Sequence, residues 1–423
     1  MVQKNSCNKK YLLLVSLDAV SDNDIDKLLK MPNFSQFCTK GTLVREVSSI
    51  FISNTYPVHT TIVTGCHPNR HGIIENMVSL PSRNNPDWHW YDKKIRVPTL
   101  YSQAKKSGLK AASIMWPVTA GAEIRYNIPE IFANRWWTNQ LGVSLVNGSP
   151  LLQLGAIVKF VRHLSKELQP QLDNFSCTTM CDIIKRKKPE LAMLHLTDVD
   201  YHKHKYGIST AEASNALERM DKRLGILLTA VEEAGISGQT SIILFGDHSM
   251  LDVNKTINFD AEFERMGLLK LDNHRRITSW RAWLKGCGGT AFLYLKDKND
   301  TEALAISKEY IGKELNNPSG SIKRFLRQHE MEISGLAKEC PFGIEAKEGF
   351  EFYKLSSKHK AAHGYSLEQE NYKTFYAAAG NMIKPGIRLS GGCLTDIAPL
   401  AVKLLGIPSW DMDGSLMEGI LRD

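Results

Sequence analysis

The sequence predicts an α/β protein in which a mainly parallel β-sheet is covered by helices on both faces. Four short apolar runs, at residues 11–17, 110–115, 191–196 and 240–245, have the length and composition of buried strands. Between these runs lie segments with helical periodicity. This alternation of strand and helix is typical of parallel sheets, whose functional sites lie where the strands end at their carboxyl edge.

The expected elements begin and end at recognisable residues. The run at 11–17 is apolar throughout, as expected of a strand buried on both faces. The segment 24–38 reads as one helix that ends before Gly41. A later helix presents one apolar face made of Leu217, Met220, Leu224, Leu227, Leu228 and Val231. The strand at 240–245 then leads directly into the polar pair Asp247 and His248.

Two segments interrupt the alternation and predict the domain organisation. We expect a catalytic core made of residues 8–251 and 355–423, with an inserted cap subdomain at 252–354 that contains a strand-like run at 290–295 and a charged helix at 301–314.

The second interruption is residues 135–170. This segment contains Trp136, Trp137 and the apolar run 151–161, and we interpret it as a helical lid within the core that lies over the site.

The composition bounds the class of protein. The chain has 423 residues, of which 43% are hydrophobic and 23% charged, so it can bury a sizeable core. Its net charge of +8 suits an anionic substrate, but short basic runs such as 185–188 read as solvated turns. We therefore expect no nucleic-acid scaffold as a partner, and the sequence leaves the oligomeric state open.

The compartment is predicted from the cysteines and from the first residues. The eight cysteines are scattered without a disulfide framework, as in a reducing compartment, and Cys177 with Cys181 makes too small a set for a zinc site. The apolar run after Lys10 is too short for a signal peptide, and no stretch reaches the roughly 18 apolar residues that span a bilayer. The prediction is a cytoplasmic protein with no membrane partner.

Aspartate and histidine gather at the ends of the predicted strands. Asp18 follows the strand at 11–17, Asp247 and His248 follow the strand at 240–245, and Asp200, His202 and His204 are expected in a loop after the strand at 191–196. Carboxylate and imidazole together suit zinc and related divalent ions. The sequence therefore predicts a metal centre at the carboxyl edge of the sheet.

Five segments, in order along the chain, resemble the nucleotide pyrophosphatase/phosphodiesterase family of the alkaline phosphatase superfamily. The longest is 54–76, which is similar to the family signature that begins Thr-Tyr-Pro and continues through Thr-Gly to Pro, His-Gly and Asn. The others are Asp200 to Gly207, Gly246-Asp247-His248-Ser249-Met250, His363-Gly364-Tyr365, and the closing segment 396–407.

The resemblance implies an alkaline-phosphatase-like fold and a two-metal phosphohydrolase. It places Asp200, His204 and His363 on one divalent ion, and Asp18, Asp247 and His248 with the Thr55 oxygen on a second. The ions would be Zn²⁺, with Mn²⁺ or another divalent ion as the alternative. It implies that Thr55 is a metal-activated nucleophile that forms a phospho-enzyme intermediate. It also implies that the side-chain amide of Asn76 donates a hydrogen bond to a non-bridging phosphoryl oxygen. A helix beginning near Pro57 would point its first amides at the phosphoryl group.

Other histidines in these segments compete for the same roles. His202 is an alternative to His204, although the four-residue spacing from Asp200 favours His204. The resemblance gives His59, His67 and His71 structural roles, and His195 reads as a satisfied buried histidine. The chain departs from the family pattern at Ala19, Val58 and Ser249, none of which removes a ligand.

The substrate is less determined than the chemistry. We expect a small phosphorylated substrate, nucleotide-derived or not, whose bulk packs against Trp88, Trp90 and Tyr91. We expect a phosphodiester substrate, because no clear pair of cationic side chains accompanies Asn76 to neutralise a third phosphoryl oxygen. The segment from Lys93 to Arg96 keeps a phosphomonoesterase or a phosphonoacetate-hydrolase-like activity open.

Two further alternatives come from other classes. The stretch Cys66-His67-Pro68-Asn69-Arg70 matches the sulfatase pattern in which cysteine matures to formylglycine, but here the Thr-Gly element precedes it. The chain could also keep the fold as a non-catalytic module that binds a phosphorylated ligand.

Overall fold

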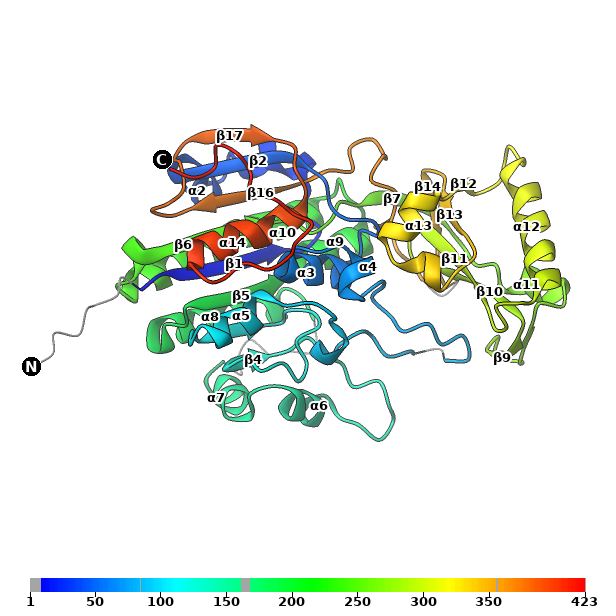
Figure 1. Cartoon of the computed structure of the whole chain (residues 1–423), viewed down its shortest axis with the longest axis horizontal. Coiled ribbons are helices and arrows are strands. Elements are labelled where there is room, and N and C mark those ends of the chain that lie inside the picture. Colours follow the sequence, from blue (N-terminus) through cyan, green and yellow to red (C-terminus); the bar gives the residue numbers. More distant parts are fainter. Residues whose placement is uncertain (1–8, 84, 161–167, 355–356, 423) are drawn as a thin grey trace, which may run out of the picture.

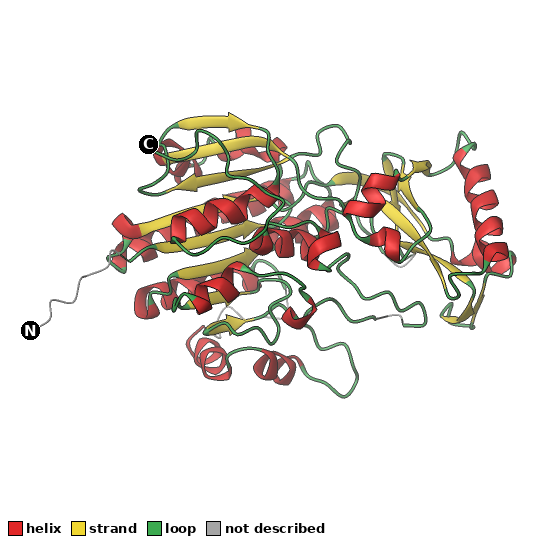
Figure 2. Ribbon diagram, viewed as in Figure 1, coloured by secondary structure: helices red, strands yellow, loops and turns green. Residues whose placement is uncertain are grey.

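A large, mainly parallel sheet forms the centre of the molecule, as the sequence predicts. The computed structural model describes residues 9–83, 85–160, 168–354 and 357–422. Figures 1 and 2 show the sheet with helices packed on both faces. Its eight strands run in the order β17 (Ile387–Ser390), β2 (Gly41–Val47), β16 (Thr374–Ala379), β6 (Thr240–Phe245), β1 (Tyr11–Leu17), β5 (Leu191–Leu196), β3 (Ala111–Ile114) and β4 (Tyr126–Ile128).

The direction of the strands departs from a uniform parallel sheet at one position. β1 pairs in parallel with both β5 and β6, and β3 pairs in parallel with β5. β16 is antiparallel to both of its neighbours, β6 and β2. The sequence prediction did not include this strand.

The two faces of the sheet carry separate hydrophobic cores. Leu13 and Val15 of β1 point into one core, and Leu12 and Leu14 into the other, as the alternation of a strand requires. The first core packs against α2 (Pro32–Lys40), α8 (Gln171–Lys187) and α10 (Ala211–Glu233). The second packs against α3 (Thr55–Thr64), α5 (Leu100–Lys106) and α14 (Ile397–Leu405).

The helix predicted at 24–38 is wrong, because the structure has two helices there. α1 covers Ile25–Leu28, and α2 begins at Pro32 and runs to Lys40. Proline fits the first position of a helix, but its ring and its missing N–H prevent it from continuing a helix that arrives from before it.

The segment between residues 251 and 362 builds three smaller sheets at the end of the molecule beyond the central sheet (Figure 1). One consists of β10 (Ala282–Gly286), β11 (Thr290–Leu295), β13 (Gly343–Ala346) and β12 (Ile322–Phe325). The second consists of β14 (Gly349–Phe352), β7 (Leu251–Ile257) and β15 (Ala361–Ala362). The third pairs β8 (Leu269–Leu271) with β9 (Ile277–Trp280). The α-helices of the segment are α11 (Asp260–Arg265), α12 (Thr301–Leu315) and α13 (Gln328–Ile333).

The second of these sheets joins the predicted cap to the predicted core. β7 and β14 belong to the segment that we assigned to the cap, whereas β15 follows residue 355. The division into a core of 8–251 and 355–423 and a cap of 252–354 stays a prediction.

Two helices form much of the segment predicted as a lid. α6 (Gln140–Asn147) and α7 (Pro150–Phe160) lie side by side, and α7 packs against α8 and β4. Part of the predicted segment, residues 161–167, lies outside the described residues. Among the helices of the described ranges, none is long and apolar enough to cross a membrane.

Gly246 joins the end of β6 to Asp247 and is closely surrounded. A β-carbon added there would lie 1.7 Å from the carbonyl oxygen of Val20 and 2.8 Å from the Thr374 hydroxyl oxygen. The first contact is with backbone, which cannot move aside cheaply. The turn that presents Asp247 and His248 therefore requires glycine.

We expect Gly246→Ala to lower the free energy of unfolding by roughly 2 to 4 kcal/mol, because the new methyl group forces the backbone near Val20 to shift. Thermal or urea unfolding measures this change. Gly238→Ala is the matched control, since a β-carbon at Gly238 meets nothing within 4 Å. An equal effect of both substitutions would contradict the steric explanation.

Candidate active site

Asp200, His204 and His363 form the first of two groups of metal-ligand side chains. Their ligand atoms all lie within 4.8 Å of one another. Asp200 and His204 are one turn apart on α9 (Asp198–Tyr206), with 3.5 Å between Asp200 Oδ1 and His204 Nε2. The loop predicted for Asp200, His202 and His204 is wrong, because these residues lie on a helix. The helix is what places Asp200 and His204 on one face.

The second group consists of Asp18, Asp200 and His248. His248 Nε2 lies 3.4 Å from Asp18 Oδ1 and 3.4 Å from Asp247 Oδ2. Asp18 follows β1 and Asp247 follows β6, and these strands are neighbours in the sheet, so their carboxyl ends bring the side chains together. The set predicted for a second ion therefore gathers at one place, with Asp200 between the two groups.

A hydrogen bond from the Nδ1 atom fixes the orientation of the ring in two of these histidines. His204 Nδ1 donates to the carbonyl oxygen of Ala361 at 2.7 Å, and His363 Nδ1 donates to Asn54 Oδ1 at 2.9 Å. In both rings Nε2 is left for the site. Such outer contacts commonly hold metal-binding imidazoles in the required tautomer.

Several buried polar atoms of the site have no hydrogen-bond partner among the described residues. They are Asp18 Oδ1, Asp200 Oδ1, Asp247 Oδ2 and His248 Nδ1. A buried carboxylate oxygen without a partner is costly, and clusters of such oxygens beside imidazole nitrogens are the donor set that divalent ions bind. The residues present therefore fit a metal centre.

The pKa values of the side chains in the site agree with a metal centre. Burial raises the pKa of Asp18 well above its usual value, and Asp247 and Asp200 raise it further. Burial also raises the pKa of Asp200 to about 6. Burial lowers the pKa of His204 to about 4 and that of His363 well below its usual value. The imidazoles of His204 and His363 are therefore neutral at pH 7, the form that binds a metal.

Thr55 is the first residue of α3 and faces the second group of ligands. Its Oγ1 lies 3.4 Å from His248 Nε2. The backbone N–H of Tyr56 donates to Asn76 Oδ1 at 2.9 Å, which holds the Asn76 side chain beside Thr55 and leaves its NH₂ group to donate elsewhere. Since Pro57 has no N–H and that of Tyr56 is bonded to Asn76, the first three residues of α3 offer only the Thr55 amide to a ligand, fewer than we expected.

The other histidines that we considered lie around the site with partners of their own. His202 bonds Asp198 at 2.9 Å and belongs to neither ligand group. His71 Nε2 contacts the Thr61 hydroxyl at 3.1 Å. His59 contacts Ser16 and the Thr55 carbonyl, each at 2.8 Å.

His195 has a larger part in the site than a satisfied buried histidine. Its Nε2 lies 3.0 Å from Asp18 Oδ2, while its Nδ1 lies 3.0 Å from the carbonyl oxygen of Met115 and 3.4 Å from Glu130 Oε2. Although burial opposes it, the nearby carboxyl groups of Asp18 and Glu130 raise the pKa of His195 well above its usual value. His195 therefore orients the Asp18 carboxylate and offsets part of its charge. Its position in β5, parallel to β1, is the sequence signal that we did not use.

A cavity of about 300 Å³ opens over Thr55 and the first ligand group. It is lined by Asn54, Thr55, Glu75, Asn76, Met77, Trp88, Asp200, His204, Cys287, Gly288, Glu351, Tyr353, His359, Ala362 and His363. Of the aromatic side chains that we expected as a substrate wall, only Trp88 is among them. Trp90 is buried in an apolar cluster with Tyr56 and Ile131, and Tyr91 lies outside the cavity.

The cationic segment near this cavity does not line it. Lys93, Lys94 and Arg96 are exposed and are not among the lining residues. The Lys93 ammonium instead lies 5.5 Å from the centre of the Tyr91 ring. Residues of α6 and α7, which we interpreted as a lid, do not line the cavity either.

The cavity has a buried polar wall that the sequence analysis missed. Lys285 of β10 forms an ion pair with Glu75 and donates to the Met77 carbonyl at 2.9 Å, while the Tyr294 hydroxyl donates to Glu75 at 2.5 Å. These bonds fix the backbone on either side of Asn76. No local pattern in the sequence predicts that Lys285 pairs with Glu75.

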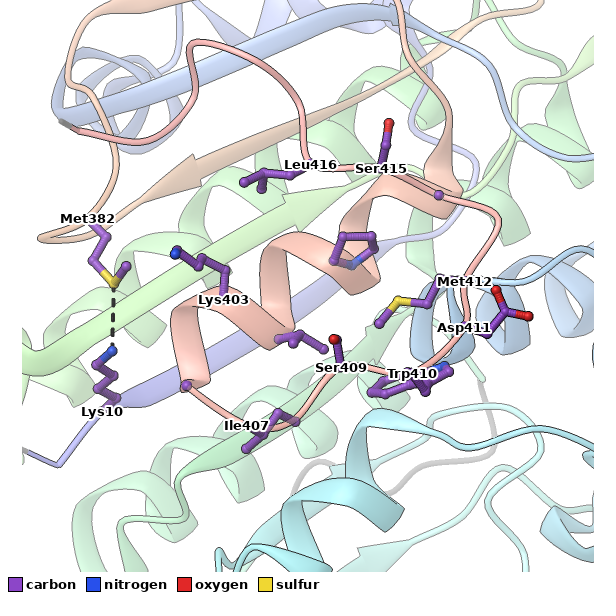
Figure 3. A pocket seen from close by; sticks show the side chains of 14 residues that line it. Lys10, Met382, Lys403, Ile407, Ser409, Trp410, Asp411, Met412, Ser415 and Leu416 are labelled. Carbon is purple, nitrogen blue, oxygen red and sulfur yellow. Dashed lines mark hydrogen bonds between the residues drawn. The ribbon is translucent and has the colours of Figure 1, made fainter.

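A wider groove of about 820 Å³ runs along α14, where Figure 3 shows Lys10, Lys403, Trp410 and Asp411 around it. It contains neither ligand group and neither Thr55 nor Asn76. We therefore place the candidate active site at the smaller cavity.

The fold and this donor set define an α/β protein with a candidate divalent-metal centre at the carboxyl edge of its central sheet. The family model described as type I phosphodiesterase / nucleotide pyrophosphatase matches residues 12–366. The chain therefore belongs to this family, whose members hydrolyse phosphodiester bonds. This confirms the resemblance inferred from the motifs.

Curated relatives match the chain to different extents. Bis(5'-adenosyl)-triphosphatase ENPP4 of Pongo abelii is 24% identical over 414 residues, which cover 96% of this chain and 80% of the relative. Venom phosphodiesterase 2 of Crotalus adamanteus is 27% identical over 237 residues, which cover 53% of this chain and 25% of the relative.

Solved structures show the same fold. Murine ectonucleotide pyrophosphatase / phosphodiesterase 5, as an inactive variant in complex with AMP, aligns with a TM-score of 0.70 at 18% identity and covers 98% of this chain and 100% of that chain. The human protein of the same name aligns with a TM-score of 0.69 at 20% identity.

We expect Asp200→Asn to stabilise the metal-free protein at pH 7, because the raised pKa means that the fold disfavours the ionised carboxylate. The gain in the free energy of unfolding should be roughly 1 to 3 kcal/mol above pH 6. It should vanish as the pH falls towards 4, where the wild-type carboxyl group is itself protonated.

Urea unfolding of the wild type and of the variant, after chelation and across pH, measures this difference. Subtracting the two curves removes the titration of His204 and His363, which acts in the opposite direction. The same variant should bind less divalent metal. A variant that is less stable than the wild type at pH 7 without metal would contradict the proposed charge repulsion.

Proposed function

We propose that this chain is a two-metal phosphodiesterase in which Thr55 is the nucleophile. The observation that carries the proposal is the convergence of a threonine hydroxyl, the Asn76 amide and the first ligand group on one cavity, with His248 of the second ligand group 3.4 Å from the threonine oxygen. Membership of a family of phosphodiester hydrolases supports the reaction class.

The proposed ligands of the first ion are the first group, and those of the second ion are Asp18 and His248 of the second group together with Asp247, whose Oδ2 lies 3.4 Å from His248 Nε2. Asp200, His204 and His363 would hold one ion, and Asp18, Asp247 and His248 would hold the other together with the Thr55 oxygen. Zn²⁺ suits this mixture of imidazole and carboxylate. Bound there, the ions would lower the pKa of the Thr55 hydroxyl and stabilise charge on the attacking and leaving oxygens.

The chain's own groups would perform the displacement. Thr55 Oγ1 attacks phosphorus as the bond to the leaving oxygen breaks, which gives a phosphothreonine that water then hydrolyses. The NH₂ group of Asn76 and the N–H of Thr55 would donate to the non-bridging oxygens. Because Asn76 is held by the N–H of Tyr56, this donor is in place before substrate binds.

A phosphodiester suits the cavity better than a phosphomonoester. No lysine or arginine appears among the described residues that line it, and Lys285 is committed to Glu75. A diester carries one negative charge fewer than a monoester dianion and brings a second substituent, for which Trp88, Met77 and Tyr353 offer a wall. The names of the relatives favour nucleotide-derived substrates. A cytoplasmic location stays a prediction.

The sulfatase alternative is disfavoured by the position of Cys66. This thiol lies just beyond the end of α3, whereas Thr55 begins the helix, and ten helical residues span about 15 Å. Cys66 is also absent from the lining of the cavity.

We expect Thr55→Ala to lower the turnover of an aryl phosphodiester by several orders of magnitude, because the covalent nucleophile is lost. Thr55→Ser, which keeps a hydroxyl group, should retain part of the rate. Steady-state kinetics and metal content are to be measured together. Near-wild-type turnover in Thr55→Ala, with metal still bound, would favour direct attack by water instead.

We expect kcat/KM for an aryl diester to exceed that for the matching monoester. Trp88→Ala should lower the diester value by about tenfold through lost contact with the second substituent. Tyr91→Ala is the matched control, since Tyr91 is an aromatic residue close to Trp88 in the sequence but does not line the cavity. A preference for the monoester would overturn the substrate class while leaving the role of Thr55 untouched.

A further inference from the structure

The segment from Phe132 to Phe160 exposes an unusual amount of apolar side chain. Trp136 is 92% exposed, Leu151 is 88% exposed, and Val146 and Val158 are each 80% exposed. We call this surface the apolar edge, and it consists of Trp136, Trp137, Leu141, Val146, Leu151, Leu154 and Val158.

The exposed residues of α7 form a stripe rather than a scatter. Leu151, Leu154 and Val158 recur at helical spacing on the outer side, while Gln153 and Ala156 are buried on the inner side. α6 is fixed beside α7 by bonds between Gln153 and the Ser144 side chain and carbonyl, at 2.6 and 2.9 Å. Figure 1 shows this helical pair at one edge of the molecule, beyond β4, the edge strand of the central sheet. Large exposed apolar surfaces of this kind mark interaction sites.

The charges of the segment are few and already paired. Residues 131–160 contain no aspartate or glutamate, and only Arg135 and Lys159 are charged. Arg135 forms an ion pair with Asp87 at 2.7 Å, and Lys159 forms one with Asp182. The apolar edge is therefore close to neutral.

We propose that the apolar edge is the interface of a homodimer, in which α6 and α7 of one copy pack against α6 and α7 of a second. In a twofold dimer the same surface meets itself, so a surface with unpaired charge would repel its copy, whereas a neutral one does not. Aromatic and aliphatic residues with few charges are the composition of the buried core of such interfaces. Two helical hairpins packed in this way form a four-helix arrangement.

A bilayer surface fits the same residues less well. Peripheral membrane helices combine an apolar face with lysine and arginine side chains that meet anionic headgroups. Here both cations of residues 131–160 are committed to carboxylates, so they add no attraction to such a surface.

The proposed interface is connected to the wall of the active-site cavity. Phe132, four residues before Trp136, contacts the Trp88 ring with 5.8 Å between ring centres. Asp87, the neighbour of Trp88, is bonded by Asn134 at 2.8 Å and by Arg135. Packing of Trp136 and Trp137 against a second copy would therefore hold the segment that supports Trp88.

The test is the mass of the protein in solution, measured by light scattering after gel filtration and by analytical ultracentrifugation. The wild type should have twice the 47.5 kDa of the chain. Leu154→Ser combined with Val158→Ser should raise the dissociation constant of the dimer by at least about tenfold. Trp136→Ser is a second variant that removes no core packing, because this side chain is almost fully exposed.

Ile226→Ser is the matched control, since Ile226 is an exposed apolar residue on α10 outside the apolar edge. It should remain a dimer. Circular dichroism confirms that the variants fold. A monomeric wild type would overturn the proposal, and so would a dimer that all of these variants leave intact. Sedimentation of a monomeric wild type with phosphatidylcholine/phosphatidylglycerol vesicles would assign the edge to a bilayer instead. None of these readouts depends on phosphodiesterase activity.

Discussion

Three carboxylates buried in one place form the constraint on which the rest of the site depends. Asp18, Asp200 and Asp247 are buried or lie deep in the cavity, and each keeps an oxygen without a hydrogen-bond partner among the described residues. Burying a single carboxylate already costs several kcal/mol. The fold tolerates the cluster because imidazoles surround it and because bound cations would neutralise it, so the site is built for an ion before it is built for a substrate.

The sheet and its nearest helices fix this arrangement from outside. The ligand helix α9 begins at Asp198, which is bonded by Arg219 and by Arg223 of α10, each at 2.7 Å. On the other side, the buried Lys203 donates to Asp24 at 2.7 Å and to the carbonyl of Ala19 at 2.9 Å. These charged contacts anchor α9 against the ends of β1 and β5. As a result Asp200 and His204 keep their positions even though mutual repulsion of the carboxylates opposes them.

The chemistry could be predicted from the sequence to a greater extent than its surroundings. Asp18, Asp247 and His248 follow apolar runs, and parallel strands place their carboxyl ends together, so their meeting needs no knowledge of the tertiary structure. The antiparallel strand β16 could not be predicted in this way, because its direction depends on how the chain returns to the sheet. The helix around Asp200 was missed because aspartate, histidine and lysine carry no apolar periodicity. The end of the first helix before Pro32 could have been predicted from this proline, and we overlooked it.

The pieces of the cavity that we failed to predict come mainly from the segment after β6. Cys287, Gly288, Glu351, Tyr353 and His359 all line it. Glu351 is fully buried and bonds His359 at 3.0 Å and Thr256 at 2.7 Å, a pairing between residues that no local pattern connects. The groups that would carry out the displacement come from the ends of β1 and β6, from α3 and α9, and from the loops at Asn76 and His363, whereas this segment supplies other parts of the wall. Changes there can alter which substituent fits beside Trp88, so the substrate depends in part on the portion of the chain that local sequence patterns describe least.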